Sequence, residues 1–507
     1  MRRVCCVFFL YALSVVIPDC EGSVPPGFHS RVTSKGFNYA AQVAVDVLST
    51  TITKQKIPDV DGSGHNLKYS LSNIKITGFD KPQSTVVPRP GSGLTWSARG
   101  LGLSIHADFK YKYKKIISIS GHGSVDVSIR DTTFSLSVGM GEDSGGRPSI
   151  KSTGCKCDVG HLSIKFHGGA SWLYNLLTGL FKGDITRQVQ RIICSSAQGA
   201  VDKNAESSLS KLPVTVTIDH KFMLDYRLLT APVFSSAAMD IMHKGEVYWS
   251  DAVQEAPFPA PPIPPITNVS RMIYFLGSEY LVNTMAYVAN KHGVLKTNVT
   301  DKDLPADKRG FLNTTCQGFT LCLGKLIPKV AELYPNSKGE LNMVSTRAPK
   351  MSISPQAIAV SFGGNISFFA RTANSSQFFM FSVGVDLNTT LTASVKDELI
   401  FGEIEKMALG VKMGDSKIGP IDAKRLQELL NGAILIYVKP QLNKLGAKGF
   451  PLPVTGRVKF VNTQLSLAQN ALILGTDLKY SPKEEALQGH NDFRVITGRE
   501  TFKNHQL

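Results

Sequence analysis

The sequence has no uninterrupted apolar run of roughly eighteen residues, the length expected of a helix that crosses a bilayer. It also lacks a G-x-S-x-G elbow, a Walker loop and a dinucleotide fingerprint. The sequence therefore gives no support for an α/β-hydrolase, a P-loop nucleotidase or a dinucleotide-binding enzyme. Charged residues make up only 19% of the chain and hydrophobic residues 42%, which excludes a charge-rich disordered protein. We therefore expect a globular protein that is not an enzyme.

Three features of the sequence are similar to parts of catalytic or metal sites. Residues 142–146 (Glu-Asp-Ser-Gly-Gly) are similar to the nucleophile segment of trypsin-like proteases, but no suitable histidine base or activated N-terminus accompanies them. We interpret them as a polar turn between strands. His161 and His167 would lie on one face of a strand about 20 Å apart, too far to share a metal. The segment Cys155-Lys-Cys157 has no second short-spaced pair, so no metal site is predicted.

The N-terminus has the pattern of a secretory signal peptide. Arg2 and Arg3 precede a short apolar core at 7–17, and Pro18 ends this core before the small residues Gly22 and Ser23. Residues 1–22 are therefore predicted to be removed, and the mature protein is predicted to be secreted.

Five cysteines remain after the signal peptide, in an oxidising compartment where disulfides persist. Cys316 and Cys322 could close a small loop. One of Cys155 and Cys157 would pair with Cys194, and this leaves an odd thiol.

The formal net charge is +16, and removal of the signal peptide does not change it. A secreted protein rarely meets nucleic acid, so the expected partner is an anionic surface made of phospholipid, glycolipid or polysaccharide.

Six N-x-S/T sequons are candidate glycosylation sites, and all of them lie in the second half of the chain. This distribution suggests that glycans shield one half and leave the other bare for contact. The sequon asparagines are Asn268, Asn298, Asn313, Asn365, Asn374 and Asn388.

A proline-rich run at 256–265 divides the mature chain into nearly equal halves, and such a run cannot join a helix or a central strand. The halves look alike. A Leu-Pro-Val-Thr segment follows a helical stretch at 212–215 and again at 452–455, and an apolar-Pro step recurs at 57–58 and 304–305. The matching order and offset indicate a tandem duplication.

Helical periodicity is present in four segments, two in each half, at 37–52, 172–193, 281–289 and 421–445. Ser278 is the expected N-cap of the third helix and Gly293 follows its end, while Pro440 should kink or end the fourth. Period-two segments at 117–120, 124–129, 134–138 and 366–369 predict half-buried antiparallel strands. Each half is therefore predicted to be a strand-rich α+β unit with two helices.

The most concentrated charge is the run Lys110-Tyr-Lys-Tyr-Lys-Lys115. On a strand, alternation puts Lys110, Lys112 and Lys114 on one face and the two tyrosines on the other. Lysines can hold lipid phosphates and tyrosine rings suit a headgroup boundary, but lysines also protect an edge strand from aggregation. Lys54 and Lys56 have a similar ambiguity, because cations at a helix C-terminus stabilise the fold itself.

Taken together, the chain resembles the family of bactericidal/permeability-increasing protein and lipopolysaccharide-binding protein, over about residues 25 to 480. The order and spacing of several segments carry this resemblance. They are Pro26-Gly27, 56–59 (Lys-Ile-Pro-Asp), 144–148 (Ser-Gly-Gly-Arg-Pro), Trp172 to Cys194, 212–214 (Leu-Pro-Val), 245–248 (Gly-Glu-Val-Tyr), the proline run, 293–296 (Gly-Val-Leu-Lys), 418–420 (Ile-Gly-Pro) and 449–453 (Gly-Phe-Pro-Leu-Pro).

The resemblance implies two tandem barrels of twisted antiparallel sheet with two helices each, joined through a central sheet in an elongated boomerang. It implies the domain order signal peptide 1–22, N-terminal lipid-binding barrel 23–250, linker 251–267 and C-terminal lipid-binding barrel 268–480, followed by a polar tail at 481–507 outside the family pattern. It also implies a Cys155–Cys194 disulfide, which leaves Cys157 as an extra thiol.

The family's ligand contact is a basic tip on the N-terminal barrel, which Lys54, Lys56, Lys110, Lys112, Lys114 and Lys115 match by region. The implied function is binding of lipopolysaccharide on the bacterial outer membrane, with antibacterial activity, by a monomer that holds phospholipid in each barrel and no other cofactor. Phospholipid transfer, or carriage of lipopolysaccharide without killing, is the alternative.

Overall fold

The computed structural model describes residues 24–481 except 52–56, 65, 115–116, 169–173, 305, 317, 319–321, 397 and 453–457. The predicted signal peptide, the tail from residue 482 onward, and Lys54, Lys56 and Lys115 lie outside the described residues. Among the helices that are described, none is both long and apolar enough to cross a membrane.

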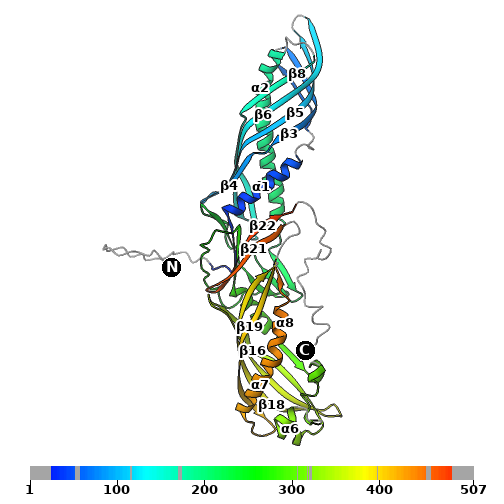
Figure 1. Cartoon of the computed structure of the whole chain (residues 1–507), viewed down its shortest axis with the longest axis vertical. Helices are drawn as coiled ribbons and strands as arrows, with labels where there is room; N and C mark the ends of the chain where they lie inside the picture. Colours follow the sequence, from blue (N-terminus) through cyan, green and yellow to red (C-terminus); the bar gives the residue numbers. More distant parts are fainter. Residues whose placement is uncertain are drawn as a thin grey trace, which may run out of the picture.

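The molecule is elongated, and its two halves lie end to end on either side of a central sheet (Figure 1). This sheet has the order β11-β12-β1-β14-β22-β21, so it takes strands from both halves. The predicted α+β class, with two units joined through a central sheet, is therefore confirmed. The strands are β1 (Phe28–Thr33), β11 (Val233–Phe234), β12 (Ala238–His243), β14 (Ile273–Ser278), β21 (Val458–Ala468) and β22 (Ala471–Tyr480).

The N-terminal half is a twisted antiparallel sheet of order β2-β3-β5-β6-β7, with β4 added to β5 and β8 added to β6. The segments predicted as separate strands between 118 and 138 form one long strand, β6. Asp131 adopts a positive φ of 54°, and the pairing of β6 with β5 shifts register near this residue. The chain therefore bends within the strand and makes no turn there. The strands are β2 (Val60–Gly64), β3 (Leu67–Asp80), β4 (Gln83–Arg89), β5 (Gly93–Lys114), β6 (Ser118–Glu142), β7 (Pro148–Asp158) and β8 (His161–His167).

Two helices accompany this sheet, α1 (Ser34–Thr51) and α2 (Tyr174–Gly199). The sheet and α2 enclose an apolar core in which Phe109, Val125 and Ile129 are buried and Ile185 and Val189 of α2 pack against them. A turn of π-helix (η3, Ala200–Ala205), the short α3 (Glu206–Leu209) and a three-stranded sheet follow, formed by β9 (Thr215–Asp219), β10 (Phe222–Asp225) and β13 (Glu246–Trp249).

The C-terminal half repeats this plan with a sheet of order β15-β16-β17-β18-β19-β20. Its core contains Phe368 and Phe381, whose rings stack 4.3 Å apart, and Leu426 of α7 packs into the same cluster. The strands are β15 (Lys296–Val299), β16 (Lys338–Ile353), β17 (Ile358–Arg371), β18 (Gln377–Lys396), β19 (Leu399–Ser416) and β20 (Phe450–Pro451).

The helix boundaries of the C-terminal half follow the local sequence signals. The Ser278 hydroxyl accepts a hydrogen bond from the Tyr280 N–H at the start of α4 (Glu279–Lys291), and Gly293 adopts a positive φ of 64° just after its end. Pro440 lies in the first turn of α8 (Lys439–Gly446), where its missing N–H is tolerated. A π-helix, η6 (Ile434–Val438), separates α8 from α7 (Ala423–Ala433), so the regular helix ends before the proline. The remaining helices are η4 (Asp301–Asp303), η5 (Ala306–Lys308), α5 (Leu323–Leu326) and α6 (Pro328–Leu333).

The proline-rich run forms no helix or strand and is anchored near both ends. The Ala256 N–H donates to Oε1 of the buried Glu246 at 2.6 Å, and the Arg31 guanidinium donates to the Ile266 carbonyl. Lys244 lies 3.4 Å from Glu246 and compensates its charge. The geometry of the connector thus depends on charged groups of β1 and β13 as well as on the prolines.

A half-buried histidine, His243, lies at the junction between the halves. Nδ1 of His243 in β12 lies 2.8 Å from the Tyr226 carbonyl and must donate to it, so in the neutral ring Nε2 accepts from the Ser30 hydroxyl 3.3 Å away. Burial lowers the pKa of His243 below its ordinary value, although the Tyr226 hydrogen bond opposes this. The ring is therefore held neutral in the folded protein.

We expect acid to weaken this junction. Because the folded-state pKa of His243 is lowered, the unfolded chain binds more protons from about pH 6.5 downward, and the free energy of unfolding falls by up to about 1.4 kcal/mol per pH unit. Urea unfolding between pH 7.5 and 5 would measure this decline. The variant His243→Gln should show a shallower decline, and an unchanged slope in that variant would exclude His243 as its source.

Candidate functional site

The predicted alternation along β5 is present in the structure. Lys110, Lys112 and Lys114 are exposed on the outer face, whereas Tyr111 is buried and Tyr113 half-buried on the inner face. The tyrosines therefore belong to the apolar interior of the N-terminal half. The interpretation of both rings as a ready headgroup contact is wrong for Tyr111, because the ring packs in the core.

Register adds a fourth lysine that the sequence did not reveal. Lys68 of β3 lies directly opposite Lys112, and Ser70 lies opposite Lys110. Two like charges at directly opposed positions of a sheet destabilise the fold. We call Lys68, Lys110, Lys112 and Lys114 the lysine face.

The lysine face borders a shallow hollow of about 560 Å³ at the outer surface of β2, β3 and β5. Hydroxyl groups and one carboxylate share this hollow with the lysines, so it offers hydrogen-bond partners as well as positive charge. Its lining comprises Asp61, Gly62, Ser63, Lys68, Tyr69, Ser70, Lys110, Tyr111 and Lys112.

The four lysines differ from several basic residues that are paired within the fold. Lys35 pairs with Asp477, Lys81 pairs with Asp46 and Arg31 pairs with Asp240. Over the described part of the chain, no member of the lysine face makes such an ion pair. Its charge is therefore available to an external anion.

The inner side of the same strands explains why the lysines are held so regularly. Phe109 and Tyr111 stack 6.1 Å apart, and Phe166 of β8 meets Phe109 edge-on at 5.3 Å. Glycines of β6 make room for these rings, since a Cβ at Gly121 would lie 2.7 Å from the Tyr111 ring and one at Gly123 would lie 2.9 Å from Phe109. The packed rings hold the backbone of β5 in place, and this backbone determines the positions of the lysines.

Histidines also lie on this outer surface, but not in the pairing considered from sequence. His106 and His167 both bond the Asp126 carboxylate, at 2.6 and 2.9 Å, whereas His161 lies 3.9 Å from Asp131. Within the described ranges, no group of three histidine, cysteine or acidic side chains is arranged to hold a metal ion.

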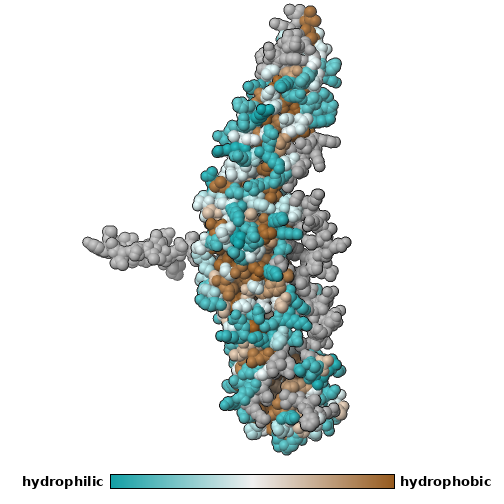
Figure 2. All heavy atoms as spheres, in the orientation of Figure 1, coloured by the Kyte–Doolittle hydropathy of each residue, from teal (hydrophilic) through white to brown (hydrophobic). Residues whose placement is uncertain are grey.

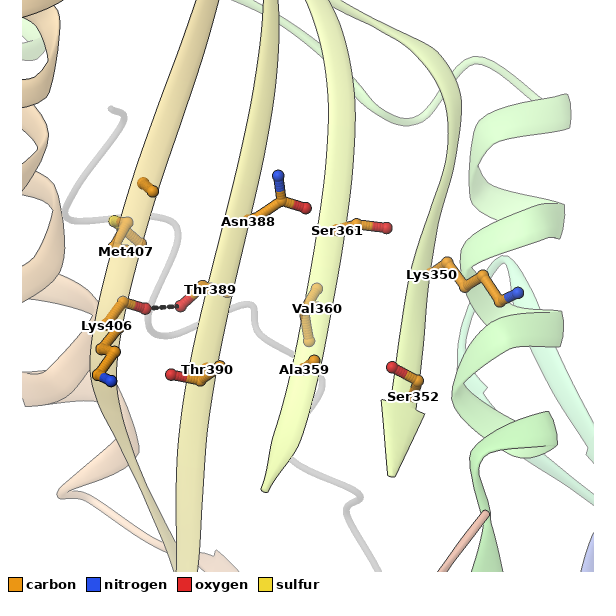
Figure 3. A pocket seen from close by; sticks show the side chains of 11 residues that line it. Lys350, Ser352, Ala359, Val360, Ser361, Asn388, Thr389, Thr390, Lys406 and Met407 are labelled. Carbon is orange, nitrogen blue, oxygen red and sulfur yellow. Dashed lines mark hydrogen bonds between the residues drawn. The ribbon is translucent and has the colours of Figure 1, made fainter. Parts of the chain in front are cut away.

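A second hollow, of about 420 Å³, lies on the sheet of the C-terminal half (Figure 3). Ser361 and Asn388 occupy neighbouring positions across β17 and β18, and Lys350 and Lys406 stand toward its two sides. Asn388 is one of the predicted glycosylation sites and is exposed, as are Asn268, Asn298 and Asn374, while Asn313 and Asn365 are half-buried. Glycosylation itself stays a prediction.

The structure contains two disulfides. Cys155 and Cys194 join β7 to α2 with Cα atoms 5.7 Å apart, and Cys316 and Cys322 close a short loop. Cys157 is a buried thiol, and burial raises its pKa above the ordinary value, with the Asp158 charge acting in the same direction. A thiol in this state is a poor nucleophile.

Two family models match the chain. Residues 36–212 match the N-terminal domain of the LBP / BPI / CETP family, and residues 216–480 match its C-terminal domain.

Full-length relatives and a solved structure agree with these matches. A bactericidal permeability-increasing protein of Sebastes schlegelii is 30% identical, over 94% of this chain and 99% of its own length. A human lipopolysaccharide-binding protein is 28% identical, over 91% and 95% of the two chains. The crystal structure of a lipopolysaccharide binding protein aligns with a TM-score of 0.57 and 25% identity, over 90% of this chain and all of that one.

Proposed function

The chain belongs to the LBP / BPI / CETP family, and on that premise we propose that it is a secreted, non-enzymatic protein that binds lipopolysaccharide of Gram-negative bacteria. The binding surface is the lysine face together with Lys54, Lys56 and Lys115. We include antibacterial activity in the proposal, and we propose that the protein acts as a monomer.

The observation that carries the proposal is the unpaired lysine face. Opposing Lys68 to Lys112 costs stability, and among the described residues no acidic side chain forms an ion pair with either lysine, although Asp61 lines the same hollow. An anionic ligand relieves it when it binds. The phosphates of lipid A match a set of point charges spaced along two neighbouring strands.

The acyl chains require a different surface. The apolar layer between the sheet and α2 has its counterpart between the C-terminal sheet and α7. We propose that acyl chains enter these layers and that phospholipid is held in each half. Burial contributes about 0.8 kcal/mol per CH₂, so a partly inserted chain rivals several salt-screened contacts.

A triple variant tests the lysine face. We expect Lys110→Ala/Lys112→Ala/Lys114→Ala to bind lipid A vesicles about 100-fold more weakly at low salt, because each lysine near an anionic surface contributes roughly 1 kcal/mol. The difference should shrink as salt is raised, because screening removes the charge contribution from the wild type as well.

The matched control carries the same charge change elsewhere. Lys396, Lys412 and Lys479 are exposed lysines of the C-terminal half and of the central sheet. Their triple alanine variant should bind nearly as wild type does. Equal weakening by both variants would show that only net charge matters, and unimpaired binding by the first variant would refute the lysine face. Salt-insensitive uptake of zwitterionic phospholipid as the sole activity would favour a lipid-transfer role.

A further inference from the structure

The hollow on the sheet of the C-terminal half, which we call the C-terminal hollow, contains a predicted glycosylation site (Figure 3). One row of paired residues crosses it from β16 to β19, through the pairs Lys350–Ser361, Ser361–Asn388 and Asn388–Ala408. Directly paired residues lie on the same face of a sheet, so the Asn388 side chain stands between a serine and an alanine. These neighbours are small and leave room above the sheet beside the asparagine.

A second row continues the hollow with polar groups. It consists of the pairs Ser352–Ala359, Ala359–Thr390 and Thr390–Lys406. The hollow measures about 420 Å³, within the range of roughly 300–1,000 Å³ that is typical of small-ligand sites. The hydroxyl oxygen of Thr390 is buried and has no hydrogen-bond partner within the described chain. Such an atom costs free energy until it is paired, so a ligand rich in hydrogen-bonding groups suits this lining.

A filled row bounds the C-terminal hollow on its other side. Arg347 lies over Gly363, where an added Cβ would come within 2.6 Å of the Arg347 Nε. The Arg347 guanidinium donates to Asp386 at 2.9 Å, and Asp386 is paired with Gly363. The open space therefore begins at the row that contains Asn388.

The position of the sequon indicates the occupant of the C-terminal hollow. Residues 388–390 are Asn-Thr-Thr, and within the described ranges the Asn388 amide makes no hydrogen bond. Because Asn388 forms part of the lining, a sugar joined to its Nδ2 begins inside the hollow. Sugar hydroxyl and acetamide groups donate and accept hydrogen bonds, as the serine and threonine hydroxyls of the lining do. A free ligand would have to compete with this covalently attached group.

Two lysines give the occupancy of the hollow a consequence for anion binding. Lys350 and Lys406 border it on opposite sides (Figure 3), and in the described part of the chain neither forms an ion pair. Their charge is therefore available to an anion, as that of the lysine face is. Hydrophilic residues cover both halves of the molecule on the face that Figure 2 shows, so surface polarity alone does not restrict anions to the N-terminal half.

We propose that the C-terminal hollow holds the first sugars of an N-linked glycan on Asn388, and that this glycan separates Lys350 and Lys406 from external anions. A glycan is bulky, so it blocks access to the lysines without neutralising them. The glycan contact goes beyond the proposed function, because it assigns a carbohydrate site to the C-terminal half. The shielding rests on the proposed function, because it restricts the proposed anion binding to the N-terminal half.

Access of peptide-N-glycosidase to the folded protein tests the glycan contact. In protein secreted from animal cells, we expect mass spectrometry to find a glycan on Asn388. The enzyme should release it about 10-fold more slowly than the glycan on Asn374, because a few hydrogen bonds of ordinary net strength correspond to a factor of this size. Asn374 is exposed in the turn between β17 and β18. After denaturation the two rates should agree, since only the fold distinguishes the sites.

Two tryptophan variants give a matched comparison on the same glycan. Ala408→Trp fills the hollow beside Asn388 and should remove most of the protection. Lys412→Trp places the same ring on the same face of β19, opposite Gly384, and should leave release slow. Thermal unfolding of both variants shows whether the fold is retained. Absence of a glycan on Asn388, or equal release from wild type and Ala408→Trp, would overturn the glycan contact.

A vesicle assay tests the shielding separately. In the background of the triple lysine variant described above, the further change Asn388→Gln should raise low-salt binding to phosphatidylglycerol vesicles by about 10-fold, because two uncovered lysines near an anionic surface contribute a factor of this order. Adding Lys350→Ala/Lys406→Ala should remove the gain. If Asn388→Gln brings no gain, the shielding is wrong.

The glycan contact and the proposed function fail in different ways. If the Asn388 glycan is protected from the enzyme but the wild type does not bind lipid A, the proposed function is wrong and the glycan contact stands. If the lysine face binds lipid A but the Asn388 glycan is released as fast as that of Asn374, only the glycan contact is wrong.

Discussion

Replacing Asp240 with alanine is expected to lower the free energy of unfolding by about 3–5 kcal/mol, because it leaves the largely buried Arg31 guanidinium without its counter-charge. Asp240 is 8% exposed and accepts hydrogen bonds from Arg31 at 2.6 and 2.7 Å and from His29 at 2.7 Å. Burial alone would raise the pKa of Asp240, but these partners more than offset it and the pKa is lowered. The carboxylate is thus charged and compensated in the fold.

The loss should be seen in the coupling between the halves, because Asp240 of β12 holds Arg31 on β1, and β1 is the strand that pairs with β14 of the C-terminal half. Chemical denaturation of the wild type should give one main transition, and Asp240→Ala should separate it into two. The variant Asp240→Asn keeps the shape and one acceptor and should lose less stability. A loss below about 1 kcal/mol for alanine would mean that solvent replaces the missing charge, as at exposed ion pairs.

Removal of the Cys155–Cys194 disulfide by Cys155→Ala is expected to cost about 4 kcal/mol, since the bond closes a loop with a sequence separation of 39. The Cys316–Cys322 bond spans a separation of 6 and should contribute about half as much in the same loop-entropy model. Thermal and denaturant unfolding of the two variants would measure the ratio.

Cys157 supplies the matched control for this experiment. It lies two positions from Cys155 on β7 and packs against the same apolar cluster, but it forms no disulfide. Cys157→Ala should cost only the packing of one sulfur, roughly 1 kcal/mol. If it costs as much as Cys155→Ala, local packing and not the cross-link determines stability here.

Features set by local pattern could be predicted from the sequence. The α+β class, the Ser278 cap and the alternation of lysines and tyrosines each depend on residues within a few positions of one another. The face of α1 shows how precise such predictions are. Helical periodicity at 37–52 places Ala41 and Ala44 on one apolar face, and Ala41 is indeed buried, but Ala44 is exposed and Val45 is buried instead.

Features set by pairing over long separations could not be predicted. Lys68 joins the lysine face only through the register of β3 with β5, and Asp240 meets His29 across 211 positions. Nothing local in the sequence distinguishes Lys68 from other surface lysines. The choice of Cys155 over Cys157 as the partner of Cys194 came from family resemblance, because the spacing of the cysteines left both open.

The shared central sheet also constrains how the chain can be made. β1 is synthesised almost first, yet its neighbour β14 begins at Ile273 and β22, the partner of β14, ends at Tyr480. At ordinary elongation rates, the ribosome needs roughly ten seconds to a minute to pass from β1 to β14. During that interval β1 has an open edge, so a nascent chain that stalls after residue 250 exposes a sheet edge that invites association with other chains. Correct assembly of the two halves is therefore an event at the end of translation.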